Sequence, residues 1–159
     1  MIISDYAKGA ITDEVVDAFA GYVRPVFIDT KHDPDMFMPI SDVTFFPNLV
    51  EYKKYLASYT RLGGKLILKR SADGLEYYEH NRLVASVPAY AKFVKSVNGA
   101  GDTVIAAYAY AKVMNIDNPL QFAACAAAIV VEKPYTATAS LDEVWYLMNE
   151  VNNVKARDV

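Results

Sequence analysis

The residues at positions 99–102, Gly-Ala-Gly-Asp, are of the types that can bind a phosphate or a developing oxyanion. Glycines let backbone N–H groups converge on an oxygen atom, because no Cβ blocks the approach. The segment leads into a predicted helix over residues 102–114, whose N-terminus adds about half a positive charge. We therefore expect Gly99, Ala100 and Gly101 to form an anion hole, with Asp102 placed to accept a proton from an attacking hydroxyl. Alternatively, the glycines only permit a tight turn and Asp102 is an ordinary residue of the first helical turn.

A second polar pair, Asn48 and Glu51, follows Pro47 at the expected start of another helix. Their spacing of three residues puts both side chains on one side of the helix, where an amide and a carboxylate could hold the waters of a magnesium ion. The same spacing is typical of a capping box, in which the two side chains satisfy backbone N–H groups of the first turn. The sequence leaves both interpretations open.

A third group of polar residues lies directly after an apolar segment at residues 66–68, which is predicted to be a strand. Ligands of open α/β sheets bind at the carboxyl edge of the strands, so these residues are candidates for binding a ligand. A solvated turn before a hairpin is the alternative. The candidates are Lys69, Arg70, Ser71 and Gly74.

The elements that must position these residues follow from the hydrophobic pattern. Strands are predicted at residues 2–4, 26–28, 43–46 and 66–68, and helices at 12–23 and about 49–58. Short apolar strands that alternate with helices favour the α/β class, with a parallel sheet covered on both faces. After residue 74 the pattern predicts an antiparallel hairpin, 75–78 and 83–86, and then helices at 102–114, at 119–131 and from residue 140. No repeat or linker divides the chain, so residues 1–159 are predicted to form one domain.

The composition narrows the class of protein. With 53% apolar and 22% charged residues, the chain fits a compact domain and excludes intrinsic disorder. The net charge of −3 does not favour nucleic acid as a partner. Cys125 is the single cysteine and is expected to be a small buried residue, which suits a reducing cytoplasm. There is no pattern of a signal peptide or membrane span, so we expect a soluble, cytoplasmic protein without membrane contact.

Taken together, these segments resemble the ribokinase (PfkB) family of carbohydrate kinases, whose signature ends in a GAGD loop and here reads VNGAGDTVIAAYA. The resemblance is strongest to the heptose-7-phosphate kinase domain of bifunctional ADP-heptose synthesis enzymes, through the segments ISDYAKGAIT, DTKHDP, FFPNLVEY and KRSADG. It runs from about residue 2 to residue 145. It implies a ribokinase-like three-layer α/β/α fold, truncated to the C-terminal, nucleotide-binding half.

The resemblance also implies an activity, namely ATP-dependent phosphoryl transfer to a hydroxyl of a sugar or sugar phosphate. In the family, the residue matching Asp102 is the catalytic base, and the backbone from Gly99 to Gly101 is the anion hole for the transferring group. Residues matching Asn48 and Glu51 organise Mg²⁺ through water. The nucleotide-binding positions correspond to Lys69, Arg70, Ser71, Gly74, Ala124 and Tyr135.

The chain also departs from the family pattern. It has about half the family's length, and the absent front half carries most of the sugar-binding residues. Ala124 replaces an asparagine near the adenine, and Tyr135 replaces the glycine of a K-x-G-T turn. The alternatives are therefore a catalytically inactive, kinase-derived nucleotide-binding or scaffold protein and one chain of a split kinase. Because the strand at residues 2–4 would expose an unpaired edge, we expect a homodimer or a complex with a separate N-terminal-half chain.

Overall fold

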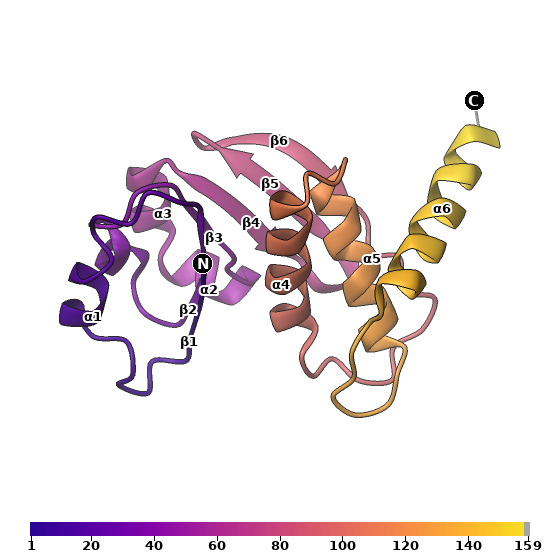
Figure 1. Cartoon of the computed structure of the whole chain (residues 1–159), viewed down its shortest axis with the longest axis horizontal. Helices are drawn as coiled ribbons and strands as arrows, with labels where there is room; N and C mark the ends of the chain where they lie inside the picture. Colours follow the sequence, from indigo (N-terminus) through magenta and orange to yellow (C-terminus); the bar gives the residue numbers. More distant parts are fainter. Residues whose placement is uncertain (158–159) are drawn as a thin grey trace. The chain divides into compact units, whose positions relative to one another are not determined.

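A computed structural model describes residues 1–157 of the chain (Figure 1). Six strands form one sheet in the order β1-β2-β3-β4-β5-β6. The strands are β1 (Ile2–Asp5), β2 (Val26–Thr30), β3 (Val43–Phe45), β4 (Lys65–Lys69), β5 (Leu75–Glu79) and β6 (Arg82–Val87). The first four strands run parallel to their neighbours, and β5 runs antiparallel to β4. The prediction of a mostly parallel sheet of the α/β class is confirmed.

The predicted hairpin is present as β5 and β6, and it turns at His80 and Asn81. Both residues have positive φ angles, 51° and 60°. A two-residue turn with two left-handed residues has the backbone twist that matches the twist of the flanking strands. The turn residues thus fix the register of the last two strands.

Six α-helices are present among residues 1–157. They are α1 (Asp13–Asp17), α2 (Leu49–Lys54), α3 (Leu56–Leu62), α4 (Ala100–Val113), α5 (Pro119–Val131) and α6 (Leu141–Arg157), and 3₁₀ turns lie at Pro34–Phe37 and Ser71–Asp73. The prediction of one helix over residues 49–58 is wrong, because the helix breaks at Tyr55, whose backbone leaves the helical region at φ −115° and ψ 30°.

The prediction of a helix over residues 12–23 is also wrong, because α1 ends at Asp17. Beyond it, the backbone N–H of Phe19 donates to the carbonyl of Val16, and that of Tyr22 donates to the carbonyl of Phe19. These bonds close tighter turns than those of an α-helix. The rings of Phe19 and Tyr22 still pack against the core. The apolar spacing therefore identified these core-facing side chains correctly, although the helix is short.

The chain divides into two compact units, and the first comprises residues 1–71 and 75–86. Its core lies around β2, all five residues of which are buried. A continuous apolar run such as Val26-Phe27-Ile28 is typical of a strand with both faces covered. The core includes Ile3, Val16, Val26, Ile28, Phe37, Phe45, Tyr59, Leu66 and Leu68.

The second unit comprises residues 72–74 and the chain from residue 87 onward. In it α4 and α5 pack side by side (Figure 1). α5 begins with Pro119 at its first turn, where proline's missing N–H costs nothing. Cys125 is buried in α5, as predicted. Among residues 1–157, none of the helices has the length and apolar character needed to span a membrane.

Candidate functional site

The Gly99–Asp102 segment forms the start of α4, in the second unit. Gly99 is the N-cap residue, with a left-handed φ of 77° that glycine adopts without strain. Its carbonyl accepts two hydrogen bonds from Thr103, one from the backbone N–H at 2.9 Å and one from Oγ1 at 2.8 Å. Ala100 and Gly101 begin the first turn, and the N–H of Ala100 donates to the carbonyl of Val97 at 3.3 Å. Asp102 is the third residue of the helix and is solvent-exposed.

The turn that carries Tyr135 lies beside this loop. A Cβ atom placed on Gly99 would lie 3.5 Å from Cγ2 of Thr136, which is an ordinary contact distance. Tyr135 has a φ of 59°, so the backbone keeps the left-handed conformation that glycine adopts most easily. Its side chain is 84% exposed and so fills no slot between the described residues. An exposed ring next to the glycine loop is available to stack on a planar ligand.

Ala124, the other predicted adenine-side residue, lies in α5 and is buried. Little of its surface is therefore open to a ligand. The structure thus places Tyr135 and the Gly99 loop together, while Ala124 belongs to the interior of the second unit.

Lys133 and Glu143 hold the Tyr135 turn against the start of α6. The Lys133 ammonium donates to Glu143 at 2.9 Å and to the carbonyl of Thr138 at 2.8 Å. Glu143 also accepts from the backbone N–H of Ser140, and Ser140 Oγ accepts from the N–H of Glu143, so the two residues form a capping box at the start of α6. The hydrogen bonds from Lys133 and Ser140 lower the pKa of Glu143 to about 2.

Glu143→Gln is expected to reduce stability in a pH-dependent way. Since the folded-state pKa is depressed, the stabilisation is present above the ordinary value of 4.5 and is lost as the pH falls toward about 2. The pair is partly exposed, so we expect the melting temperature to fall by no more than about 3 °C at pH 7. Calorimetry at pH 7 and pH 2 measures this. The same substitution at Glu150, near the middle of α6, is the control, and a difference that persists at pH 2 would contradict the assignment.

Asn48 and Glu51 lie in the first unit, where the structure shows the capping box. Asn48 Oδ1 accepts from the N–H groups of Val50 and Glu51, both at 2.9 Å, and Glu51 Oε2 accepts from the N–H of Asn48 at 2.8 Å. The other carboxylate oxygen of Glu51 contacts the ammonium of Lys31. Burial disfavours the charged form of Lys31, but Glu51 outweighs it and raises the pKa of Lys31. Glu51 is thus paired with Lys31, the residue that directly follows β2.

Lys69 and Asp29 form a second ion pair at the same edge of the sheet. Burial raises the pKa of Asp29 in spite of the Lys69 ammonium, and the Glu51 carboxylate adds to the rise. Asp29 Oδ1 is buried and accepts no hydrogen bond from the described residues. Lys69 also forms a parallel bridge with Asn48. The carboxyl ends of β2, β3 and β4 therefore bring two lysines and two carboxylates together.

The remaining candidates follow β4. Arg70 donates to Glu76 on β5 at 2.5 Å. Ser71 is exposed and has a φ of 54°. Gly74 is buried with a φ of 91°, and a Cβ there would collide with the carbonyl of Val87. Gly74 therefore has a structural reason to be glycine, which the sequence alone did not reveal.

The predicted site residues thus fall into two groups. Asn48, Glu51, Lys69, Arg70 and Ser71 belong to the first unit, and Gly74, the Gly99 loop, Asp102, Ala124 and Tyr135 belong to the second. Sequence reasoning missed the edge residues Lys31 and Asp29. The polar segment Asp29-Thr30-Lys31, which directly follows a buried strand, was the signal that could have found them. No cluster of three or more metal-ligating side chains occurs in the part of the chain that the structure describes.

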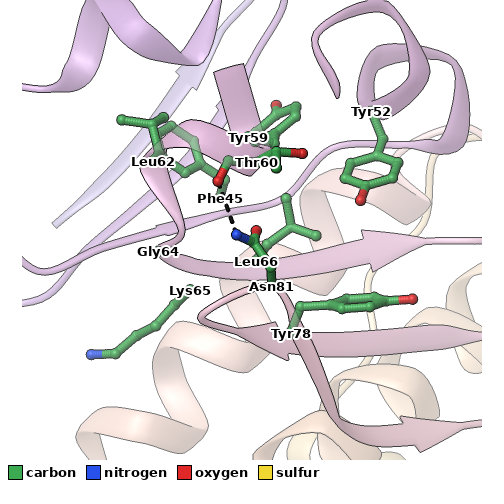
Figure 2. Close-up of a pocket in the computed structure, with 10 residues that line it drawn as sticks. All are labelled: Phe45, Tyr52, Tyr59, Thr60, Leu62, Gly64, Lys65, Leu66, Tyr78 and Asn81. Atoms are coloured by element: carbon green, nitrogen blue, oxygen red, sulfur yellow. Dashed lines mark hydrogen bonds between the residues drawn. The ribbon is translucent and has the colours of Figure 1, made fainter. Parts of the chain in front are cut away.

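A separate cavity of about 220 Å³ opens at the other end of β4 (Figure 2). Aromatic rings form much of its wall, and Asn81 Nδ2 donates to the carbonyl of Thr60 at its rim. The lining residues are Phe45, Tyr52, Tyr59, Thr60, Leu62, Gly64, Lys65, Leu66, Tyr78 and Asn81. None of the predicted site residues lines it.

Comparison with solved structures defines the class of fold. Arabidopsis thaliana ribokinase, solved with ribose and ATP, superposes with a TM-score of 0.75 at 22% identity, over 92% of this chain and 55% of that one. A putative ribokinase II from E. coli, solved with ATP and Mg²⁺, gives a TM-score of 0.65 at 21% identity, over 87% of this chain and 52% of that one. The fold is therefore ribokinase-like and spans about half of each neighbour.

Sequence comparison identifies the family. A model of the pfkB family of carbohydrate kinases matches residues 44–143. The Bifunctional protein HldE of a Nitratiruptor species is 34% identical over 163 residues, which cover 91% of this chain and 34% of the relative. The chain belongs to the PfkB family of carbohydrate kinases, and it spans about a third of the length of this curated relative.

Proposed function

We propose that the chain is the nucleotide-binding half of an ATP-dependent kinase that phosphorylates a hydroxyl of a sugar or sugar phosphate. The start of α4 supports this proposal most directly. There Gly99 is the N-cap of a helix of 14 residues, and Asp102 is exposed in the first turn. A helix N-terminus favours negative charge, and an adjacent carboxylate can take up a proton. Sugar-dependent formation of ADP with the front half supplied tests the proposal, and an absence of ADP formation with every sugar would count against it.

The proposed reaction is a single displacement. Asp102 accepts the proton of the acceptor hydroxyl while the hydroxyl oxygen attacks the γ-phosphorus of ATP. The bond between that phosphorus and the bridging oxygen breaks, and ADP leaves with the bond's electron pair. The N–H groups of Gly99, Ala100 and Gly101 stabilise the charge on the phosphoryl oxygens. Proton, phosphoryl group and electron pair are all accounted for without a further reactant.

The residues at the sheet edge fit Mg²⁺ only through water. Asn48 Oδ1 already accepts two backbone hydrogen bonds, and Glu51 is engaged by Lys31 and the N–H of Asn48. The orphaned Asp29 Oδ1 provides an acceptor for a metal-bound water. Mg²⁺ usually keeps several of its waters, which agrees with such an arrangement. When bound, it would neutralise charge on the nucleotide phosphates.

The residues proposed to bind the nucleotide come from both units. They are Lys69, Arg70 and Ser71 in the first unit and Gly74, Ala124 and Tyr135 in the second. Because phosphate contacts would come mainly from backbone groups and Ala124 is buried, we expect ATP to bind with a dissociation constant of roughly 100 μM or weaker, with little preference over GTP. Titration calorimetry measures both constants. ATP binding near 1 μM with strong rejection of GTP would contradict this expectation.

Tyr135→Ala is expected to weaken ATP binding by about 5-fold, since stacking on a base contributes roughly 1 kcal/mol or more. The Tyr135→Phe variant keeps the ring and should bind like the wild-type chain. Tyr146, which is also exposed, provides a matched control through Tyr146→Ala. Equal ATP affinity of the Tyr135→Ala and wild-type chains would remove Tyr135 from the nucleotide site.

The front half would come from a further segment or a second chain. β1 lies at the end of the sheet order, and Ile2 and Val23 expose 45% and 89% of their surfaces. These residues favour a homodimer or a complex with an N-terminal-half chain, which covers the edge. Light scattering at micromolar concentration tests this, and a stable monomer would overturn it. The family and the buried thiol of Cys125 favour a cytoplasmic location.

An inactive nucleotide-binding or scaffold protein is the second candidate. The burial of Ala124 and the bulky Tyr135 in a glycine-like turn favour it. A chain that binds ATP but transfers no phosphoryl group when the front half is supplied would belong to this class.

A further inference from the structure

His32 and Asp5 form a hydrogen-bonded pair at the carboxyl ends of β2 and β1, in the first unit. Nδ1 of His32 lies 2.7 Å from Oδ2 of Asp5. Asp5 is almost fully buried, at 4% exposure. Thr30 Oγ1 donates to Asp5 Oδ2 at 2.6 Å, and the N–H of Ala7 donates to Oδ1 at 2.9 Å. Each oxygen of the carboxylate therefore has at least one donor.

These hydrogen bonds favour an ionised Asp5 and a proton on Nδ1 of His32. Burial favours the neutral acid, but the donors Thr30, Ala7 and His32 outweigh it and hold the pKa of Asp5 below its ordinary value. A carboxylate can only accept hydrogen bonds, so the ring of His32 carries its proton on Nδ1. In the neutral ring Nε2 then carries a lone pair. The His32 side chain is 36% exposed, so part of the ring is open to a ligand.

The pair lies at the same edge of the sheet as Lys69, and its assignment to the acceptor rests on the proposed function. The first unit presents the nucleotide candidate Lys69 after β4, Glu51 after β3, and His32 after β2, in sheet order. A continuous chain of contacts joins them, because Lys69 bridges Asn48, Glu51 contacts Lys31, and the N–H of Lys31 donates to the carbonyl of Asp5.

In phosphoryl transfer the attacking and leaving oxygens lie roughly in line across the phosphorus. If the nucleotide lies toward β4, the acceptor lies toward β2 and β1. The exposed ring of Tyr6 follows β1 at this same end. The Lys8 ammonium lies 5.9 Å from the centre of this ring. A sugar presents C–H groups that pack on an aromatic ring and hydroxyl groups that donate hydrogen bonds.

We propose that His32 binds a hydroxyl of the acceptor sugar through Nε2 and that Asp5 is a positioning residue that fixes its tautomer. His32 accepts a hydrogen bond from the substrate. It does not take up the proton during the transfer, since Asp102 has that role. The role of Asp5 is to keep Nε2 an acceptor. Asp5→Asn would place an amide N–H beside Nδ1 and turn Nε2 into a donor.

Nitrogen-15 NMR of the histidine rings tests this assignment directly on the whole chain. The sequence has two histidines, and His80, in the exposed hairpin turn, serves as the internal reference. The chain is titrated with D-ribose, D-fructose, D-mannose and, separately, inorganic phosphate. We expect the free ring to show a proton on Nδ1, and at least one sugar to shift His32 Nε2 in a saturable way while His80 stays unchanged. The proposal would be overturned if phosphate shifted His32 Nε2 and no sugar did, or if none of the added compounds shifted it.

Two variants complete the test. Asp5→Asn should exchange the His32 tautomer and weaken sugar binding about 10-fold. Because Asp5 is buried and this variant could unfold, His32→Ala provides a second measurement, with sugar binding followed by saturation-transfer NMR and the same 10-fold loss expected. Unchanged sugar binding in His32→Ala would overturn the proposal.

The outcomes separate this inference from the proposed function. If sugars bind at His32 but no phosphoryl transfer occurs with the front half supplied, the sugar site stands and the kinase function fails. If transfer occurs and His32→Ala leaves the KM for the sugar unchanged, the kinase function stands and the role of His32 is wrong.

Discussion

Asp102→Asn is expected to lower the turnover number by about 100-fold or more while leaving the dissociation constant of ATP nearly unchanged. The carboxylate is required only when the acceptor hydroxyl loses its proton, and the asparagine amide cannot accept that proton. Asparagine has nearly the same size as aspartate, and the Gly99 carbonyl still accepts both hydrogen bonds from Thr103. Steady-state kinetics with the front half supplied give the turnover number, and calorimetry gives the ATP affinity.

Asp117→Asn is the matched control, since Asp117 is an exposed aspartate of the same unit and is not part of the proposed site. Its turnover should equal that of the wild-type chain. Near-normal turnover of Asp102→Asn would remove this residue from the role of base, and a parallel loss of ATP binding would instead show that Asp102 acts in nucleotide binding.

Gly74→Ala is expected to destabilise the fold by about 3 kcal/mol or more. Gly74 has a φ of 91°, and a methyl group there would overlap the backbone of Val87, Pro88 and Ala89. Backbone cannot move aside as the end of a flexible side chain can, so the chain around Gly74 must shift. Urea unfolding followed by circular dichroism measures the loss of free energy.

Gly64→Ala is the control for this substitution. Gly64 has no atom within 4 Å of the added Cβ and no left-handed φ. The urea midpoint of unfolding of the Gly64→Ala variant should stay close to that of the wild-type chain. If the two variants had the same midpoint, the close approach at Gly74 would not determine the stability of the fold.

The sequence allowed the regular elements to be predicted where local signals agree. The helix at Pro119–Val131 was predicted with its observed bounds, because proline marks its first turn and the apolar run continues to its end. The helix over residues 12–23 was overpredicted, because the spacing of Phe19 and Tyr22 fits successive tight turns as well as an α-helix. Periodicity reports which side chains face the core, and it does not distinguish the turns that bring them there.

The candidate site was predictable only where its residues are neighbours in sequence. The capping box of Asn48 and Glu51 is local and was among the alternatives read from the sequence. The contact of Glu51 with Lys31 and that of His32 with Asp5 join residues 20 and 27 positions apart. Such contacts depend on the pairing order of the strands, which no local pattern encodes.

Phosphorus-31 NMR of the chain with its front half, MgATP and a panel of sugars tests the central claim most directly. We predict that a phosphate ester of at least one sugar appears together with an equal amount of ADP, and that Asp102→Asn suppresses both signals. If the chain binds ATP but no sugar yields an ester above the level without protein, the proposal that this chain belongs to a working sugar kinase is wrong.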